Sequence, residues 1–400
     1  MPTSAKVRRP GEETAVIHAP MLKPGIFENL GTKPVINACG IYTDLGGSVL
    51  SPGVWSAMEE ANRSFVSMVD LLEKSGRVLA GLVGAEAARV TPGASAAIAL
   101  GAAACMTGMD GTKWERLPDT TGMKNEVVMQ RRHRYKYDRC SRMTGARIVE
   151  AGDEIGTTLQ QLQAAIGPQT AAILFPAHLE TKPGTVPLLE VTRLARRAGV
   201  PTLVDAAYLN YPPERMSSYT AAGADLVCFS AKYYWGPNSG GFICGRKDLI
   251  DAVAGVDFTR YESGKYLTFG RPFKMDRQIV VGTVVALQEW FSMDHEARWN
   301  GYARKVDQMM RWLESIPGIT LAPRCFTMDE RLVAEPVNCL AIGFGPESGT
   351  NAEEVSTRLS EGNPSIAAVV LGDTLVVATD ALLDGQEVLI ADKLREVLQT

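Results

Sequence analysis

Phe229-Ser230-Ala231-Lys232 ends a short apolar run that begins at residue 226, and Gly236-Pro237 follows it. A lysine directly after a buried strand is unusual, because lysine is rarely buried without a function. Burial lowers the pKa of the amine and makes it available to attack a carbonyl carbon. Taken alone, however, Lys232 could be a lysine whose ammonium group reaches solvent from the end of a strand.

The run before Lys232 is one of several in the middle of the chain. These runs are too short for helices and too continuous for strands with one exposed face, and they lie at residues 127–129, 171–175, 202–204, 226–229 and 242–244. Amphipathic segments at residues 159–166 and 188–197 separate some of them and are typical of helices. Buried strands that alternate with helices predict an α/β fold whose sheet is mostly parallel and covered on both faces.

A carboxylate ends another of these runs. Asp205 follows residues 202–204 and precedes Ala206-Ala207. Because α/β sheets bind ligands at the carboxyl ends of their strands, we expect Asp205 at the same edge as Lys232. There its carboxylate could form an ion pair with a protonated ring nitrogen of a ligand. At a distance of about 4 Å this attraction is worth about 4 kcal/mol before the cost of desolvation. The alternative is an ordinary aspartate that caps the next helix.

A third feature precedes both residues in the chain. Thr91-Pro92-Gly93-Ala94-Ser95-Ala96 leads into an alanine-rich segment that is typical of a buried helix. Small residues let backbone N–H groups approach a phosphate, and a helix N-terminus carries roughly half a positive charge. Gly93, Ala94 and Ser95 are therefore candidate phosphate ligands, although the same residues would also suit tight helix packing.

The flanking regions predict further domains. A helix begins at Pro52 and, by its apolar spacing, ends at Gly76. Beyond Arg271 we expect an α+β layout, with one or two helices at 276–313, a strand at 338–342, a helix at 352–359, a hairpin around Gly372-Asp373 and a helix at 387–398. The predicted division is an N-terminal segment at 1–50, a large domain at 51–285 and a smaller C-terminal domain at 286–400. The first thirty or so residues are expected to form an arm on the surface or on a partner subunit.

Composition excludes several classes. A formal net charge of −4 argues against a large nucleic-acid interface. The seven cysteines include no C-x-x-C pair and the four histidines show no metal-ligand spacing, so neither a disulfide framework nor a metal site is expected. The N-terminus has no apolar signal region, and residues 90–109 are too rich in glycine and alanine for a membrane span. We expect a cytoplasmic protein.

Taken together, these segments resemble those of the bacterial selenocysteine synthase family, which uses pyridoxal 5'-phosphate (PLP) and has fold type I, the aspartate aminotransferase fold. The similarity is greatest to its short members that do not act on tRNA, such as the D-glucosaminate-6-phosphate ammonia-lyases. It is carried by residues 36–40, 84–88, 204–205, 229–232 with 236–237, and 270–274.

The resemblance implies roles for single residues. Lys232 would hold PLP as a Schiff base, and Asp205 would pair with its pyridinium nitrogen. The remaining cofactor contacts would come from Gly93, Ala94, Ser95, Ala207 and Ser230. His133 falls where relatives carry a ring-stacking or proton-handling residue, or it lies in a basic surface loop. Arg271 and His178 are candidates for binding the substrate, with Arg271 at its carboxylate.

The basic run at residues 131–142 allows two interpretations. It could attract an acidic substrate or a tRNA, or it could be a solvated loop that forms ion pairs within the chain or with a partner. Selenocysteine synthases that act on tRNA carry a dedicated N-terminal domain, for which the residues before Asn37 are too few. A role with nucleic acid is therefore not expected.

The resemblance leaves several reactions open. We favour removal of the Cα proton by Lys232 and β-elimination from a β-hydroxy or β-substituted amino acid, as in an ammonia-lyase or dehydratase. The runner-up is retro-aldol cleavage, with His133 or His178 as the base. Racemisation, group transfer and a PLP-fold protein without turnover are further alternatives. The family also implies at least a homodimer, in which the arm and residues 37–47 would reach the neighbour's cofactor.

Overall fold

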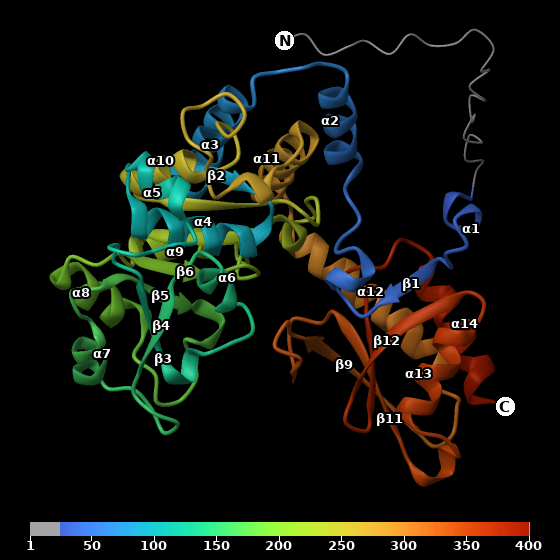
Figure 1. Ribbon diagram of the computed structural model, residues 1–400. Helices are drawn as coiled ribbons and strands as arrows, with labels where there is room; N and C mark the ends of the chain where they lie inside the picture. The colour runs from blue at the N-terminus through green and yellow to red at the C-terminus, as the bar shows by residue number, and fades with distance from the viewer. Residues whose placement is uncertain (1–24, 400) are drawn as a thin grey trace, which may run out of the picture.

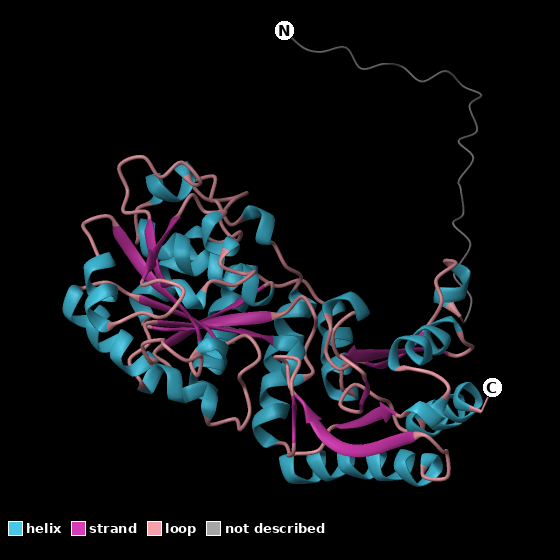
Figure 2. Cartoon of the chain, turned by 90° about the horizontal axis from the view of Figure 1, so that it is seen from below, coloured by secondary structure: helices cyan, strands magenta, loops and turns pink. Residues whose placement is uncertain are grey.

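The computed structural model describes residues 25–399, which form two sheets with their covering helices (Figures 1 and 2). Most of the predicted N-terminal arm lies outside the described residues. Short α1 (Ile26–Asn29) opens the described chain at one side of the C-terminal region. None of the described helices is both long and apolar enough to cross a membrane.

The larger sheet has seven strands in the order β2-β8-β7-β6-β5-β3-β4. The strands are β2 (Ala87–Thr91), β3 (Glu126–Gln130), β4 (Arg147–Ala151), β5 (Thr170–Pro176), β6 (Thr202–Asp205), β7 (Leu226–Ser230) and β8 (Gly241–Gly245). The strands from β4 to β7 are parallel, and β8 runs antiparallel to both of its neighbours. The sheet is thus mostly parallel, as the buried apolar runs predict.

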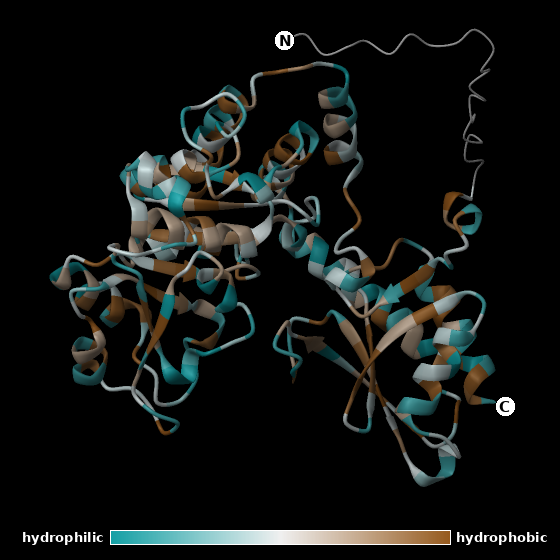
Figure 3. Cartoon of the chain, in the orientation of Figure 1, coloured by the Kyte–Doolittle hydropathy of each residue, from teal (hydrophilic) through white to brown (hydrophobic). Residues whose placement is uncertain are grey.

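Helices cover both faces of this sheet, because alternate strand residues enter two separate cores. Val204 packs in one core and Leu203 in the other. One layer contains α3 (Met68–Val83), α7 (Leu159–Ala165), α8 (Leu188–Ala198), α9 (Arg215–Ala221) and α11 (Arg277–Ser292). The other contains α4 (Gly93–Thr107), α5 (Gly111–Arg116) and α10 (Lys247–Val256). Figure 3 shows apolar colour along the strands between these layers.

The helix predicted from Pro52 to Gly76 is wrong in its extent. The chain forms α2 (Pro52–Asn62), breaks, and then forms α3, which ends at Gly84 with φ 64°. Gly76 lies inside α3 because the helix packs closely on β2: a Cβ at this position would lie 2.1 Å from the carbonyl oxygen of Ala88. The glycine therefore serves a close approach and not a helix end.

The second sheet has six strands in the order β1-β12-β13-β11-β9-β10. They are β1 (Val35–Ala38), β9 (Ile319–Phe326), β10 (Leu332–Val333), β11 (Cys339–Phe344), β12 (Ser365–Leu371) and β13 (Thr374–Ala378). Only the β1–β12 pair is parallel. Its core is closed by α12 (His295–Leu313), α13 (Ala352–Glu361) and α14 (Gln386–Leu398). The division at residues 50 and 285 remains a prediction, although β1 shows that the N-terminal segment adds a strand to the C-terminal sheet.

Candidate active site

Lys232 lies in the short helix η4 (Ala231–Tyr234), directly after the carboxyl end of β7. Its side chain is largely buried, and its Nζ donates a hydrogen bond to Oγ1 of Thr43 at 2.7 Å. The Nζ also lies 4.9 Å from the centre of the Tyr233 ring. Burial lowers the pKa of Lys232, the charge of Lys136 adds to this effect, and Asp44 opposes it. The amine of Lys232 is thus fixed in position, and its lowered pKa makes it a candidate nucleophile.

Asp205 ends β6, the strand next to β7, so the two residues share one edge of the sheet. Its carboxylate accepts a hydrogen bond from the hydroxyl of Tyr135 at 2.6 Å and another from the backbone N–H of Ala207 at 3.1 Å. Burial raises the pKa of Asp205, and these donors, together with the nearby His178, oppose the shift. A cationic ligand nitrogen at this carboxylate would further favour its ionised form.

The predicted phosphate turn lies at the N-terminus of α4. Gly93 has φ 81°, a left-handed conformation that glycine adopts without strain. Ala94 is buried and Ser95 is exposed. Gly241 of β8 packs against this turn, since a Cβ there would lie 2.8 Å from the Cα of Gly93. The turn therefore presents a helix N-terminus and a serine at the sheet edge, where an anion can bind.

A row of aromatic rings borders Asp205. The ring of Tyr135 lies 5.4 Å from His178, which lies 5.7 Å from Tyr208, which in turn lies 5.8 Å from Tyr233. Burial lowers the pKa of His178, so its imidazole is neutral near pH 7. The row links the carboxylate side of the site to the lysine side.

The second sheet reaches this site through the turn that joins β9 to β10. Asp329 accepts a hydrogen bond from the hydroxyl of Tyr208 at 2.5 Å, and Glu330 accepts one from Tyr42 at 3.3 Å. Glu330 has φ 56°, which is costly for a residue other than glycine. Tyr42 precedes Thr43, the partner of Lys232, in the turn η1 (Thr43–Leu45). Both acidic residues of the turn thus accept hydrogen bonds from tyrosines close to the contacts of Lys232, since Tyr208 packs on Tyr233 and Tyr42 precedes Thr43.

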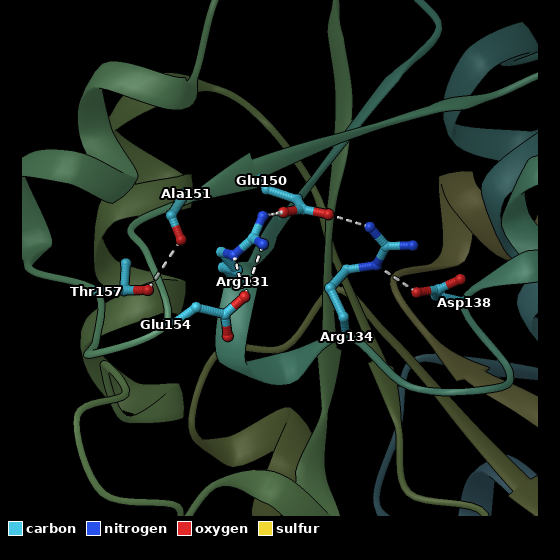
Figure 4. Close-up of polar contacts among 7 residues, drawn as sticks. All are labelled: Arg131, Arg134, Asp138, Glu150, Ala151, Glu154 and Thr157. Carbon is cyan, nitrogen blue, oxygen red and sulfur yellow. Dashed lines mark hydrogen bonds and ion pairs between the residues drawn. The ribbon is translucent and has the colours of Figure 1, made fainter.

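The basic run after β3 forms ion pairs within the chain (Figure 4). Arg131 contacts both Glu150 and Glu154, and Arg134 contacts Glu150 and Asp138. Arg132 donates to two backbone carbonyl groups at residues 154 and 155. The structure thus pairs Arg131 and Arg134 within the chain, whereas Lys136 is exposed and the Nε of Arg132 has no hydrogen-bond partner among the described residues.

Comparisons with known proteins agree with this geometry. The aminotransferase class-V family profile matches residues 135–328. The chain is 31% identical over 393 residues to a D-glucosaminate-6-phosphate ammonia lyase of Salmonella typhimurium, covering 94% of this chain and 99% of the relative. It is 26% identical over 409 residues to an L-seryl-tRNA(Sec) selenium transferase of Moorella thermoacetica, covering 92% and 82%. The chain belongs to the selenocysteine synthase-like family of fold-type I PLP enzymes.

Further similarities were found to one other protein and to two solved structures. A 5'-C-glycyluridine monooxygenase-decarboxylase of a Streptomyces species is 33% identical over 302 residues, covering 74% of this chain and 72% of the relative. A solved structure of a D-glucosaminate-6-phosphate ammonia-lyase superposes with a TM-score of 0.82 at 30% identity, covering 94% and 98% of the two chains. A Sphingomonas wittichii serine palmitoyltransferase, at 12% identity and TM-score 0.55 over 91% and 87%, shares the fold.

The residues of this family member fit the cofactor that the family uses. A buried amine, a buried carboxylate and a helix N-terminus opened by a left-handed glycine meet at one sheet edge. Lys232 would bind the reactive carbon of the cofactor, and Asp205 would bind its ring nitrogen. The turn at residues 93–95 would bind its phosphate. Ser230 and Ala207 also lie at this edge, where the N–H of Ser230 donates to the carbonyl of Ala207 at 3.0 Å.

Two predicted site residues form no hydrogen bond, ion pair or ring contact with Lys232 or Asp205 among the described residues. His133 is fully buried in η2 (Arg131–His133), where its ring contacts Phe175 at 4.9 Å and burial lowers its pKa to about 4. Arg271, in η5 (Arg271–Phe273), forms an ion pair with Glu262 at 2.9 Å. Their roles remain predictions. His178, the other substrate candidate, does lie beside Asp205.

The sequence also left several contributors unnamed. Tyr135, Tyr208 and Asp329 carry no motif, and each meets its partner only in the folded chain. Thr43 belongs to the segment expected to reach a neighbour's cofactor, yet it contacts Lys232 of its own chain. The only local signal was the bulk of the residues after Lys232, where Tyr233 extends the aromatic row.

Proposed function

We propose that this protein is a PLP-dependent enzyme that acts on an amino acid and holds its cofactor as a Schiff base on Lys232. The observation that carries the proposal is the meeting of Lys232 and Asp205 at the ends of adjacent parallel strands. When bound, PLP withdraws electrons from the bonds at the substrate α-carbon. The protein decides which of these bonds is broken.

The chain supplies binding, orientation and a proton acceptor. Asp205 would keep the ring nitrogen protonated while Tyr135 and Ala207 fix its carboxylate. The turn at residues 93–95 would bind the phosphate. Lys232 would take the Cα proton on its Nζ, because burial already lowers the pKa of this amine. The aromatic row would limit water access on the side of Tyr135.

The favoured reaction is β-elimination from a β-hydroxy or β-substituted amino acid, as in an ammonia-lyase or dehydratase. A relative named as an ammonia lyase, matched over nearly the whole chain, supports this choice. Retro-aldol cleavage is the alternative, and His178 is favoured as its base because its neutral imidazole lies beside Asp205.

The proposal is tested by the visible spectrum of the purified protein before and after borohydride. We expect an absorption band that borohydride removes, and its loss or shift in Lys232→Ala. Lys124→Ala is the matched control and should keep the band, since Lys124 is an exposed lysine that does not act on the pKa of Lys232. A colourless protein that takes up no added PLP contradicts the proposal. Release of keto acid and ammonia from β-hydroxy amino acids, against release of aldehyde, then separates elimination from retro-aldol cleavage.

We further propose that the enzyme is a cytoplasmic homodimer or higher homo-oligomer with a small-molecule amino acid substrate and no nucleic-acid partner. The family expectation supports the oligomer. Light scattering on the active protein tests it, and a fully active monomer would contradict it.

A further inference from the structure

A cavity with a volume of about 810 Å³ lies between the N-terminal segment, the loop after Lys232 and the helices of the C-terminal region. Its wall includes Trp235, three residues beyond Lys232, the N-terminal segment at Ser48, the start of α12 at Arg298, and Asp380 after β13. Ser48 donates a hydrogen bond to the carbonyl of Gly236 at 3.2 Å, so the cavity adjoins the loop that follows the lysine.

Arg298 is one of three basic residues that line this cavity, together with Arg304 and Lys305. Its guanidinium lies 4.6 to 5.8 Å from the centres of four aromatic rings, which belong to Trp290, Tyr211, Trp299 and Tyr302. These rings restrict the plane of the guanidinium. Its Nε and Nη2 are buried, and neither has a hydrogen-bond partner among the described residues.

Other arginines of the chain show what this edge of a guanidinium binds. Arg89 directs Nε and Nη2 at one carboxylate oxygen of Asp257, at 2.9 and 2.5 Å. Arg131 directs the same two atoms at Glu154, at 2.9 and 2.6 Å. A carboxylate is therefore the group that the free edge of Arg298 matches in geometry and charge.

The same cavity carries an acid with an unsatisfied oxygen. Asp380 lies beside Gly40, and its Oδ1 has no hydrogen-bond partner within residues 25–399. Asp384 and Glu387 also line the cavity, but Asp384 forms an ion pair with Lys305 at 3.1 Å and Glu387 accepts a hydrogen bond from the N–H of Gly385 at 3.0 Å. The carboxylate of Asp380 would repel an anion but would accept a hydrogen bond from an ammonium group. Both ends of a zwitterion thus find a partner of opposite charge.

We propose that this cavity binds a small amino acid or a similar zwitterion, with its carboxylate on Arg298 and its ammonium group towards Asp380. The site is separate from the one at Lys232 and does not depend on the proposed reaction. Because buried polar groups normally have partners, the concentration of unpaired atoms here is the observation that carries the inference.

The probe is N,N-dimethylglycine, a zwitterion whose tertiary amine cannot form a covalent link to PLP. Trp235 lines the cavity and Trp290 and Trp299 contact the guanidinium of Arg298, so three of the six tryptophans can change their fluorescence when the probe binds. We expect saturable fluorescence and calorimetric titrations of the holoenzyme. The visible band that reports on Lys232 should not be displaced with the same midpoint.

Two variants test the two ends of the ligand. Arg298→Lys keeps the charge but loses the paired N–H edge, and should weaken binding about tenfold or more. Asp380→Asn should remove the preference for dimethylglycine over acetate. Arg311→Lys, an exposed position at the far end of the same helix, is the matched control and should bind as the wild type does.

The inference is overturned if the wild type gives no saturable signal in either titration. It is also overturned if Arg298→Lys binds the probe as tightly as the control, or if acetate binds as well as dimethylglycine to the wild type. A visible-band titration with the same midpoint would assign the probe to the Lys232 site and would equally overturn it.

Discussion

The sheet edge at Lys232 and the cavity at Arg298 both bury atoms of charged side chains. The two regions differ in whether these atoms have hydrogen-bond partners. At the sheet edge Asp205 has two hydrogen-bond donors, and Lys232 has Thr43 as its acceptor. At the cavity Arg298 and Asp380 keep buried atoms that no described residue satisfies. The fold therefore satisfies the first set of side chains, whereas the second set keeps buried atoms without a hydrogen-bond partner among the described residues, as the proposed ligand site requires.

The largest expected effect concerns the sheet edge. Asp205→Asn should lower turnover by about a thousandfold, because an ion pair of about 4 kcal/mol to the ring nitrogen would be lost. Tyr135→Phe, which removes one donor but keeps the carboxylate, is the comparison variant and should lose much less. Cofactor affinity and initial rates measure both. Equal losses in the two variants would show that the hydrogen bond, and not the charge, matters.

The next effect compares Arg89, which forms a buried ion pair, with Arg298, which forms no ion pair among the described residues. Arg89 and Asp257 are both nearly inaccessible, so Arg89→Met should lower the free energy of unfolding by about 3–5 kcal/mol. Arg298→Met breaks no hydrogen bond to Nε or Nη2 and should lose at least about 2 kcal/mol less. Urea unfolding measures both changes. Similar losses would mean that Arg298 is a structural residue.

A smaller effect depends on pH. In the unfolded chain His133 binds a proton near pH 6.5, whereas in the folded chain burial lowers its pKa to about 4. Stability that is present above pH 6.5 is therefore lost as the pH falls towards 4. Between pH 7 and pH 5 this histidine should account for about 2 kcal/mol of lost stability. His133→Gln should remove that part of the pH dependence. Burial raises the pKa of Asp380 to about 6, which has the opposite sign but is common to both proteins. Equal pH dependence in both proteins would contradict the assignment.

The smallest effect concerns the exposed pairs of the basic segment. The side chains of Arg131 and Glu154 are 43% and 79% exposed, so Glu154→Gln should change the free energy of unfolding by less than about 1 kcal/mol. The change should shrink further in high salt. A loss comparable to that of Arg89→Met would contradict the distinction between paired charges at the surface and paired charges in the core.

The secondary structure was predictable where burial was continuous. The apolar runs became β3, β5, β6, β7 and β8, because strands covered on both faces contain few polar residues. β2 was missed because Arg89 interrupts its apolar pattern. The partner of that arginine, Asp257, lies 168 residues away. β4 was missed because most of its residues are only partly buried.

The sequence by itself determined the family, the fold class and the strand ends that carry Asp205 and Lys232. These are local properties, since a polar residue at the end of an apolar run marks a sheet edge wherever the strand lies. Only the tertiary structure decided which residues form hydrogen bonds at this site. Thr43 meets Lys232 across 189 residues, Tyr135 meets Asp205 across 70, and Asp329 meets Tyr208 across 121. The free edge of Arg298 is decided in the same way, because whether a buried charge finds a partner depends on how distant segments pack.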